Sequence, residues 1–135
     1  AMIPVGQALE TSGISLNIAN FISSSTAGMA LPWLILMVLV ITMFVSDIVN
    51  NAATAVIMAP IAANLALQVG QPVEPFLMAV AVGASCAFLS PIGHQCNTLV
   101  MAPGNYKFGD YWRLGLPLEC VIVAISIPMI LFVWT

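Results

Sequence analysis

Two short polar segments interrupt an otherwise apolar chain, and they constrain its fold more than any other feature. The first polar segment covers residues 46–54 and the second covers residues 90–98, and each follows one apolar run and precedes another. Inside a bilayer, backbone that is not helical is tolerated only where protein buries it or water reaches it. The two segments therefore predict a site for a polar solute within a membrane protein.

The composition indicates a chain that resides in a membrane. Of its 135 residues, 61% are hydrophobic and only 5% are charged, whereas a soluble domain carries about 25% charged residues. Because so few charges cannot cover a water-facing surface, we predict a multi-pass membrane protein. The chain has no basic patch, which excludes nucleic acid as a partner. Apolar residues run up to both of its ends, so we expect it to be part of a longer membrane protein.

The first half of the chain predicts three membrane-associated elements. Residues 1–13 are typical of the end of a membrane helix, and residues 14–26 are typical of an amphipathic helix in the interface. Residues 30–69 are apolar on both sides of the first polar segment, which predicts a helical hairpin with its tip at residues 46–54. The apolar run over residues 30–45 reaches roughly 24 Å, short of the roughly 30 Å hydrocarbon core. This length favours a re-entrant hairpin and leaves a pair of full spans as the alternative.

The second half predicts a broken helix, a loop and a final span. Residues 76–102 are apolar around the second polar segment, so we expect a transmembrane helix broken at residues 90–98. Residues 103–113 hold the two basic side chains of the chain, and basic loops lie on the cytoplasmic side. Residues 114–134 reach roughly 31 Å, enough to span the bilayer. The prediction is thus an all-α integral membrane fold.

Both polar segments resemble those of a known transporter family. Residues 44–55 are similar to the hairpin tip of the divalent anion:sodium symporter family, which includes dicarboxylate, sulfate and citrate transporters. Residues 85–98 resemble the second unwound segment of that family, and residues 104–118 resemble the lead-in to its last helix. The Asn-Asn-Ala sequence of the tip is most similar to a bacterial subgroup of permeases.

The resemblance implies an inverted-repeat transporter of which this chain is the C-terminal half. Each half would carry an interfacial helix, a re-entrant hairpin and a broken transmembrane helix. The implied partners are the N-terminal half of the same transporter, a second copy in a homodimer, the lipid bilayer of the bacterial inner membrane and a small anionic substrate. The implied function is sodium-coupled symport of a divalent anion, such as sulfate, a dicarboxylate or citrate, by alternating access.

The resemblance also implies a sodium site, because the hairpin tip and the broken helix hold a cation together in the family. Sodium is the implied coupling ion, and unwound helix ends supply backbone carbonyls to it. Carried over by position, the implied sodium ligands are Ser46, the Val49 carbonyl, Asn51, the Gly93 carbonyl and Asn97.

The implied substrate contacts come from both polar segments. Helix N-termini attract anions, and helices expected to begin near Asn51 and Asn97 would point theirs at these segments. The chain departs from the family pattern at Ala52, where the family has a threonine, and at His94 and Gln95, where it has a Thr-Pro pair. The predicted substrate-binding residues are Asn50, Asn51, Thr54, His94, Gln95, Asn97 and Thr98.

Three ionisable residues have two interpretations each. His94 either contacts the substrate or takes part in coupling, or it is a structural, hydrogen-bonded histidine. Asp47 either caps helix backbone or pairs elsewhere, or it attracts the cation or acts in gating. Glu119 is expected to reach the membrane interface or to pair with Arg113.

Other classes of protein fit the sequence less well. Ser46 or Ser90 with His94 and Asp47 resembles the content of a hydrolytic triad, but no nucleophile elbow or HExxH motif accompanies it. We therefore predict that the chain is not an enzyme. A channel is disfavoured because no repeated selectivity-filter sequence is present. A proton- or cation-coupled antiporter of the same superfamily is the alternative to the symporter.

Overall fold

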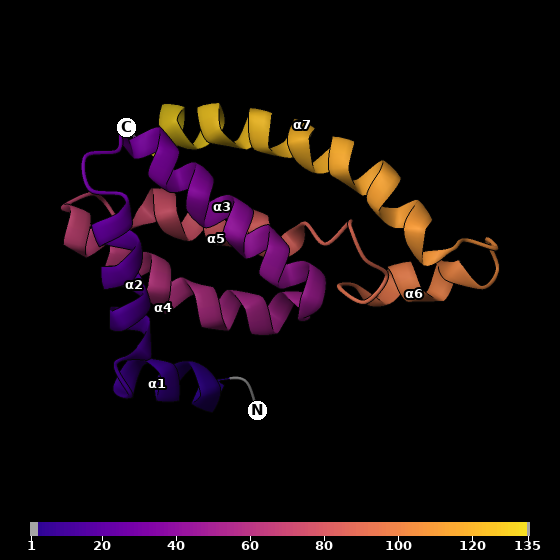
Figure 1. Cartoon of the computed structure of the whole chain (residues 1–135), viewed down its shortest axis with the longest axis horizontal. Helices are drawn as coiled ribbons and strands as arrows, with labels where there is room; N and C mark the ends of the chain where they lie inside the picture. The colour runs from indigo at the N-terminus through magenta and orange to yellow at the C-terminus, as the bar shows by residue number, and fades with distance from the viewer. Residues whose placement is uncertain (1–2, 135) are drawn as a thin grey trace.

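The chain folds into helices that meet at its two polar segments. The computed structural model describes residues 3–134 and, within them, contains seven helices and no strand (Figure 1). The helices are α1 (Ile3–Thr11), α2 (Ile14–Ser25), α3 (Leu31–Ile48), α4 (Asn51–Val69), α5 (Glu74–Ser85), α6 (Gln95–Met101) and α7 (Phe108–Trp134). Among the described residues, α3, α4 and α7 are long and apolar enough to cross a membrane. The predicted all-α membrane fold is confirmed at this level.

The first polar segment is almost entirely helical, unlike the broad tip expected at residues 46–54. Only residues 49–50, here called the first break, separate α3 from α4. Asn50 makes so short a connection possible, because its side-chain oxygen accepts a hydrogen bond from the Ala53 amide at 2.8 Å and caps α4. Because both helices extend into the first polar segment, α3 is roughly 27 Å long and α4 is roughly 28 Å long. The re-entrant hairpin and the pair of full spans both stay predictions.

The break in the second polar segment lies earlier than the predicted residues 90–98. α5 ends at Ser85 and α6 begins at Gln95, so the non-helical backbone covers residues 86–94, here called the second break. Its first residues are apolar, and only the family resemblance over residues 85–98 indicated unwound backbone there. They leave the helix because distant side chains bind their backbone: Leu89 donates to Asp47 at 3.0 Å, and Ala87 accepts from Asn97 at 2.9 Å.

The last helix begins earlier than the predicted residues 114–134 and shortens the loop predicted at 103–113. The Asp110 carboxylate accepts a hydrogen bond from the Lys107 amide at 2.9 Å, which caps the first turn of α7. α7 therefore runs from Phe108 and contains both Pro117 and Pro128. It lies along the outside of α3 and α5, as Figure 1 shows.

α2 crosses α4 and presents an uncovered apolar face. It buries Ser15 and Ala19, whereas Ile14 is 47% and Phe21 is 74% exposed. An apolar face that the protein does not cover is what an interfacial helix requires, so the interfacial placement of residues 14–26 stays a prediction. α1 occupies most of the predicted membrane-helix end at residues 1–13, of which residues 1–2 lie outside the described residues.

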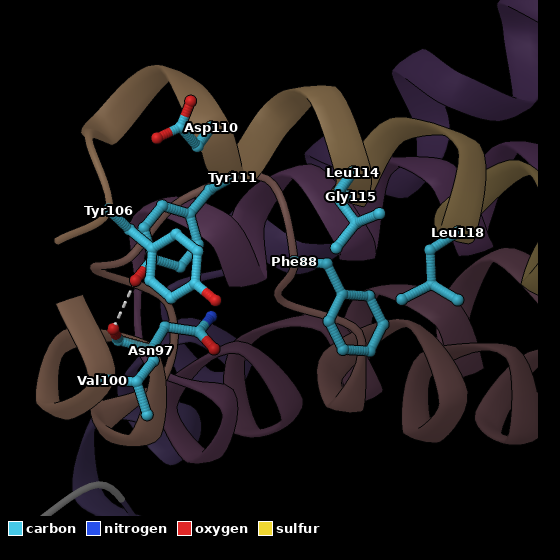
Figure 2. A pocket seen from close by; sticks show the side chains of 9 residues that line it. All are labelled: Phe88, Asn97, Val100, Tyr106, Asp110, Tyr111, Leu114, Gly115 and Leu118. Carbon is cyan, nitrogen blue, oxygen red and sulfur yellow. Dashed lines mark hydrogen bonds between the residues drawn. The ribbon is translucent and has the colours of Figure 1, made fainter. Parts of the chain in front are cut away.

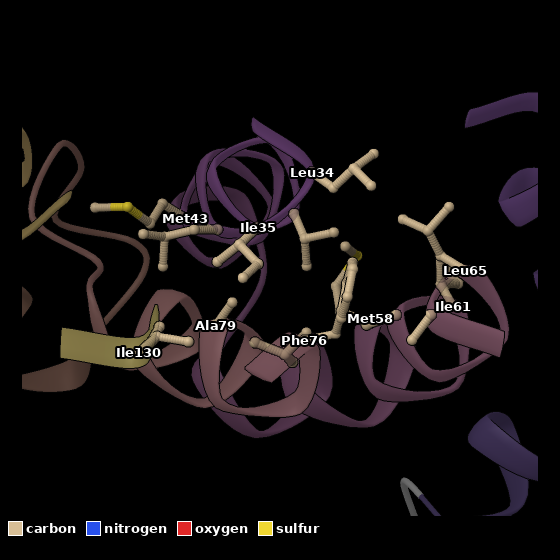
Figure 3. Packing of buried hydrophobic residues seen from close by; sticks show 14 of the residues in the cluster. Leu34, Ile35, Met43, Met58, Ile61, Leu65, Phe76, Ala79 and Ile130 are labelled. Atoms are coloured by element: carbon tan, nitrogen blue, oxygen red, sulfur yellow. The ribbon is translucent and has the colours of Figure 1, made fainter. Parts of the chain in front are cut away.

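α3, α4 and α5 supply most of the core, to which α2 adds Ala19 and α7 adds the buried Ile130. Leu34 and Ile35 from α3 face Met58 from α4 and Phe76 from α5 (Figure 3). These side chains are between 0% and 5% exposed. The three helices are thereby held in fixed register, which brings the C-terminal ends of α3 and α5 to the same region.

Gly115 brings α7 into backbone contact with the second break. A Cβ at this position would collide with the Phe88 carbonyl group, including its carbon at 2.7 Å, whereas a Cβ at Gly109 on the same helix would meet nothing within 4 Å. Because backbone cannot yield as a flexible side chain does, we expect Gly115→Ala to lower the free energy of unfolding by about 1–3 kcal/mol.

The matched control is Gly109→Ala, which should leave stability unchanged or raise it slightly by reducing the freedom of the unfolded chain. Thermal unfolding of both variants of the full-length protein in detergent measures the difference. Equal melting temperatures in the two variants would contradict the close contact between α7 and the second break.

Candidate functional site

The end of α3 and the start of α4, which flank the first break, lie against the second break. The Asp47 carboxylate accepts from the Leu89 amide at 3.0 Å, and the Ser90 hydroxyl donates to the Asp47 carbonyl at 2.6 Å. Gly93 packs so closely that a Cβ there would lie 2.8 Å from the Ser46 carbonyl oxygen. Residues about forty positions apart are therefore joined into one site, as the two polar segments predict.

Four oxygen-bearing groups converge where the breaks meet, and we call them the oxygen cluster: the Ser46 hydroxyl, the Asn51 side-chain amide, the Ala84 carbonyl and the Gly93 carbonyl. One terminal atom of the Asn51 amide lies 2.9 Å from Ser46 Oγ, 3.1 Å from Ala84 O and 3.3 Å from Gly93 O. Ser46 is completely buried and its hydroxyl also lies 2.8 Å from Ala84 O. The cluster therefore forms a compact, buried polar centre.

The Asn51 amide fits the oxygen cluster in two orientations with different chemistry. With its nitrogen toward the cluster, the NH₂ group donates to Ser46, Ala84 and Gly93. With its oxygen toward the cluster, Asn51 Oδ1 accepts from the Ser46 hydroxyl, and the Ala84 and Gly93 carbonyl oxygens lie beside it, which is a set of oxygens that a cation can share. The Ala84 carbonyl is available because it lies in the last turn of α5, where helix carbonyls lack an intrahelical partner.

Ser46, Asn51 and Gly93 are the predicted sodium ligands that the structure brings together. The Ala84 carbonyl, which is also in the cluster, was not predicted, because every residue has a carbonyl and only the structure shows which one lies at the end of α5 beside Ser46. Val49 ends α3 in an extended conformation directly beside the cluster in sequence, and its carbonyl stays a predicted ligand. Asn97 has another task, since its amide nitrogen donates to the carbonyls of Ala87 and Ser90.

The remaining predicted substrate residues differ in how deeply their side chains are buried. Thr54 is completely buried, and its hydroxyl has no hydrogen-bond partner among the described residues. Gln95 and Thr98 are exposed on α6, although the Thr98 hydroxyl donates to the Pro91 carbonyl at 2.6 Å. Asn50 is the cap of α4, so its side-chain oxygen is engaged.

His94 caps α6. Its Nδ1 accepts a hydrogen bond from the Cys96 amide at 3.1 Å, and its side chain is otherwise exposed. This contact supports the structural interpretation of His94 and leaves Nε2 open to solvent. A role in substrate contact stays a prediction for that second nitrogen.

Glu119 is half-buried and forms no ion pair with Arg113 within residues 3–134, whereas its placement at the membrane interface stays a prediction. Its Oε1 is buried and has no hydrogen-bond partner within residues 3–134. The carboxyl group faces the Phe88 backbone and lies near Asp47. Asp47 is itself only 6% exposed, and its Oδ2 is also buried without a partner. Two acids therefore flank the second break from α3 and α7.

A cavity of about 290 Å³ lies next to the second break, between α6 and α7 (Figure 2). Its walls are mostly apolar, with Phe88 and Leu118 facing the space and Asn97 at one end. The Tyr111 hydroxyl donates to the Asn97 backbone carbonyl at 2.7 Å and ties α7 to α6. The cavity does not include the oxygen cluster, so it is separate from the candidate cation site.

The chain is similar to transporters along its whole length. The model of the citrate transporter family matches residues 1–135. An uncharacterized transporter of Escherichia coli, YfbS, is 39% identical over 133 residues, which cover 96% of this chain and 21% of that protein. Sodium/sulfate cotransporter 2 of Chlamydomonas reinhardtii is 30% identical over 131 residues, covering 93% of this chain and 14% of the relative. Sodium-dependent high-affinity dicarboxylate transporter 3 of Caenorhabditis elegans is 31% identical over 121 residues, which cover 87% of this chain and 21% of that protein.

These similarities bear on the class of protein. The chain spans between 14% and 21% of the length of these curated relatives. The matched family and the relatives are transporters and not enzymes. The resemblance carried by the two polar segments is therefore confirmed, and so is the prediction that the chain is not an enzyme.

The cap at His94 is testable without reference to transport. His94→Ala removes the acceptor for the Cys96 amide, and loss of such a cap costs about 1 kcal/mol. We expect amide hydrogen exchange across residues 95–101 to become about fivefold faster, because 1 kcal/mol corresponds to roughly that factor. His94→Asn is the matched control, since asparagine is a good cap. Exchange in His94→Ala that is as slow as in the wild type would show that the histidine ring does not hold the start of α6.

Proposed function

This chain belongs to the citrate transporter family, and we propose that it forms part of a secondary active transporter that carries a divalent anion together with sodium. Sulfate, a dicarboxylate or citrate is the proposed substrate, and alternating access is the proposed mechanism. The observation that carries the proposal is the oxygen cluster at the meeting point of the two breaks. The names of the sodium/sulfate and dicarboxylate relatives support the same coupling.

Sodium is the proposed ion of the oxygen cluster. Its ligands are Ser46 Oγ, Asn51 Oδ1 and the carbonyls of Ala84 and Gly93, with the Val49 carbonyl as a further ligand. A helix end and unwound backbone supply these oxygens, as in other transporters with discontinuous helices. The Asn51 amide turns its oxygen inward when sodium binds and its nitrogen inward when sodium leaves. The polar centre is thereby satisfied in both states.

The anion is proposed to bind on the exposed side of the second break. Gln95 and His94 Nε2 offer hydrogen-bond donors there, and the N-terminus of the long helix α4 adds a positive dipole near Asn50 and Asn51. Thr54 contacts the anion only if α4 separates from its neighbours, because its side chain is completely buried. Asn97 and Thr98 hold the backbone that presents these groups.

The whole transporter is proposed to contain more than this chain. An N-terminal half with a second hairpin would complete the anion site, and two copies would form a homodimer in the bacterial inner membrane. The loop before α7 carries Lys107, and α7 carries Arg113 near its start, which favours a cytoplasmic location for this end. The chain covers only a small part of the length of its relatives, which is consistent with this larger architecture.

Proton- or cation-coupled antiport is the second candidate. The observation that favours it is the pair of buried acids, Asp47 and Glu119, each of which has one carboxylate oxygen without a partner among the described residues. Ionisable groups inside a membrane protein commonly mark ion or proton pathways. The two candidates differ in the gradient that drives uptake.

The driving gradient decides between the candidates. In liposomes that contain the full-length protein, we expect uptake of radiolabelled sulfate, succinate or citrate under an inward sodium gradient and negligible uptake with potassium in its place. The physical reason is that an empty oxygen cluster does not stabilise the substrate-loaded state. Uptake that follows a pH gradient and ignores sodium would favour the antiporter.

The sodium site itself is tested by substitution in the oxygen cluster. Asn51→Ala removes one ligand and should raise the sodium concentration for half-maximal uptake by about tenfold, which corresponds to about 1.4 kcal/mol. Asn64→Ala is the matched control, because Asn64 lies on the same helix and contacts Ser15 of α2 instead. An unchanged sodium requirement in Asn51→Ala would remove Asn51 from the ion site.

A further inference from the structure

Asp47 and Ser90 are not members of the oxygen cluster, but they link the end of α3 to the second break. The Asp47 carboxylate accepts from the Leu89 amide, and the Asp47 backbone carbonyl accepts from the Ser90 hydroxyl. One residue at the end of α3 thus binds two successive residues of the second break. Asp47 is only 6% exposed, so this junction lies inside the protein.

Ser90 also shapes the turn that follows it. Its hydroxyl accepts from the Ile92 amide at 3.2 Å and from the Gly93 amide at 3.3 Å. A serine hydroxyl has one donor and two acceptor positions. With one hydrogen bond donated and two accepted, Ser90 has no lone pair left for a cation. Its task in this structure is therefore to hold backbone.

The turn held by Ser90 ends at a carbonyl of the oxygen cluster. Gly93 fits against α3 only because it has no side chain, since a Cβ there would lie 2.8 Å from the Ser46 carbonyl oxygen and 3.2 Å from Asp47 Cα. The Gly93 carbonyl consequently lies 3.3 Å from the Asn51 amide. A shift of the turn by a fraction of an ångström would move this oxygen out of reach of an ion shared with Ser46 and Asn51.

We propose that Asp47 and Ser90 are positioning residues that set the sodium affinity of the transporter by fixing the Gly93 carbonyl, without contacting the ion. This inference rests on the function proposed above and assigns Asp47 its role as a hydrogen-bond acceptor. The negative charge of Asp47 is not what the site uses. The carboxylate and the Ser90 hydroxyl act as one unit, because both bind the same stretch of the second break.

Four substitutions separate hydrogen bonding from charge in the full-length protein. Asp47→Asn keeps an oxygen that accepts from Leu89 and removes the charge, whereas Asp47→Ala removes both. Ser90→Thr keeps the hydroxyl, whereas Ser90→Ala removes it. Ser85→Ala is the matched control, because the Ser85 hydroxyl bonds within its own helix to Ala81.

The measurements are sodium-dependent uptake of a divalent anion into liposomes and thermal unfolding of each variant. We expect Ser90→Ala and Asp47→Ala to raise the half-saturating sodium concentration by about tenfold. The KM for the anion at saturating sodium should stay within about twofold of the wild type. Ser90→Thr, Asp47→Asn and Ser85→Ala should each need the same sodium concentration as the wild type within about twofold.

Any other result would contradict one part of this proposal. Loss of sodium affinity in Asp47→Asn equal to that in Asp47→Ala would mean that the charge acts on the ion. An unchanged sodium requirement in Ser90→Ala would remove Ser90 as a positioning residue. If Ser90→Ala does not fold, Ser90→Cys takes its place, because a thiol is a weak donor and acceptor. A wild type whose uptake ignores sodium overturns the proposed function, and this inference with it.

Discussion

The second break must find partners for its backbone polar groups outside any helix, because a buried N–H or C=O group without a partner costs free energy. An unpaired N–H or C=O group in a hydrocarbon environment costs several kcal/mol. Side chains supply the missing partners: Asp47 and Ser90 accept from amides, and Asn97 and Thr98 donate to carbonyls. The break persists at this place because each of these partners is within reach.

The same requirement explains why the two breaks lie together. A partner for the Leu89 amide has to come from another element, and the end of α3 supplies it through Asp47. Packing of α3 on α5 in the core holds these ends side by side. The Ser46 hydroxyl, the Asn51 amide and the carbonyls of Ala84 and Gly93 then meet at one point and form the oxygen cluster. The candidate cation site is therefore a by-product of how the backbone is paired.

The sequence was sufficient for the number of breaks and for much of the site. The family resemblance of the polar segments implied Ser46, Asn51 and Gly93 as ligands, and the structure brings these three residues together. The exact extent of each break was not predictable, because an apolar residue such as Ala87 unwinds only when Asn97 is available to bind its carbonyl. The Ala84 carbonyl has no residue-type signal at all. Asn97 and Thr98 look like ligands in a sequence, since the chemistry that binds a solute also binds backbone.

The start of α7 was mispredicted for a related reason. Hydropathy marks the apolar part of a helix, whereas Asp110 extends the helix into polar residues by capping it at Lys107. His94 similarly starts α6 at Gln95, inside the residues 90–98 that were expected to be unwound. Local hydrogen bonds of single side chains thus decide the ends of helices that overall composition predicts.

The hydrogen bond between Ser90 and Asp47 has a consequence for the order of folding. It joins residues 43 positions apart and closes a loop that contains all of α4 and α5. Closure of such a loop becomes favourable only after the enclosed helices have formed and packed. We therefore expect the oxygen cluster to form late in assembly, so that a sodium site in this region would report that the helices around it have packed.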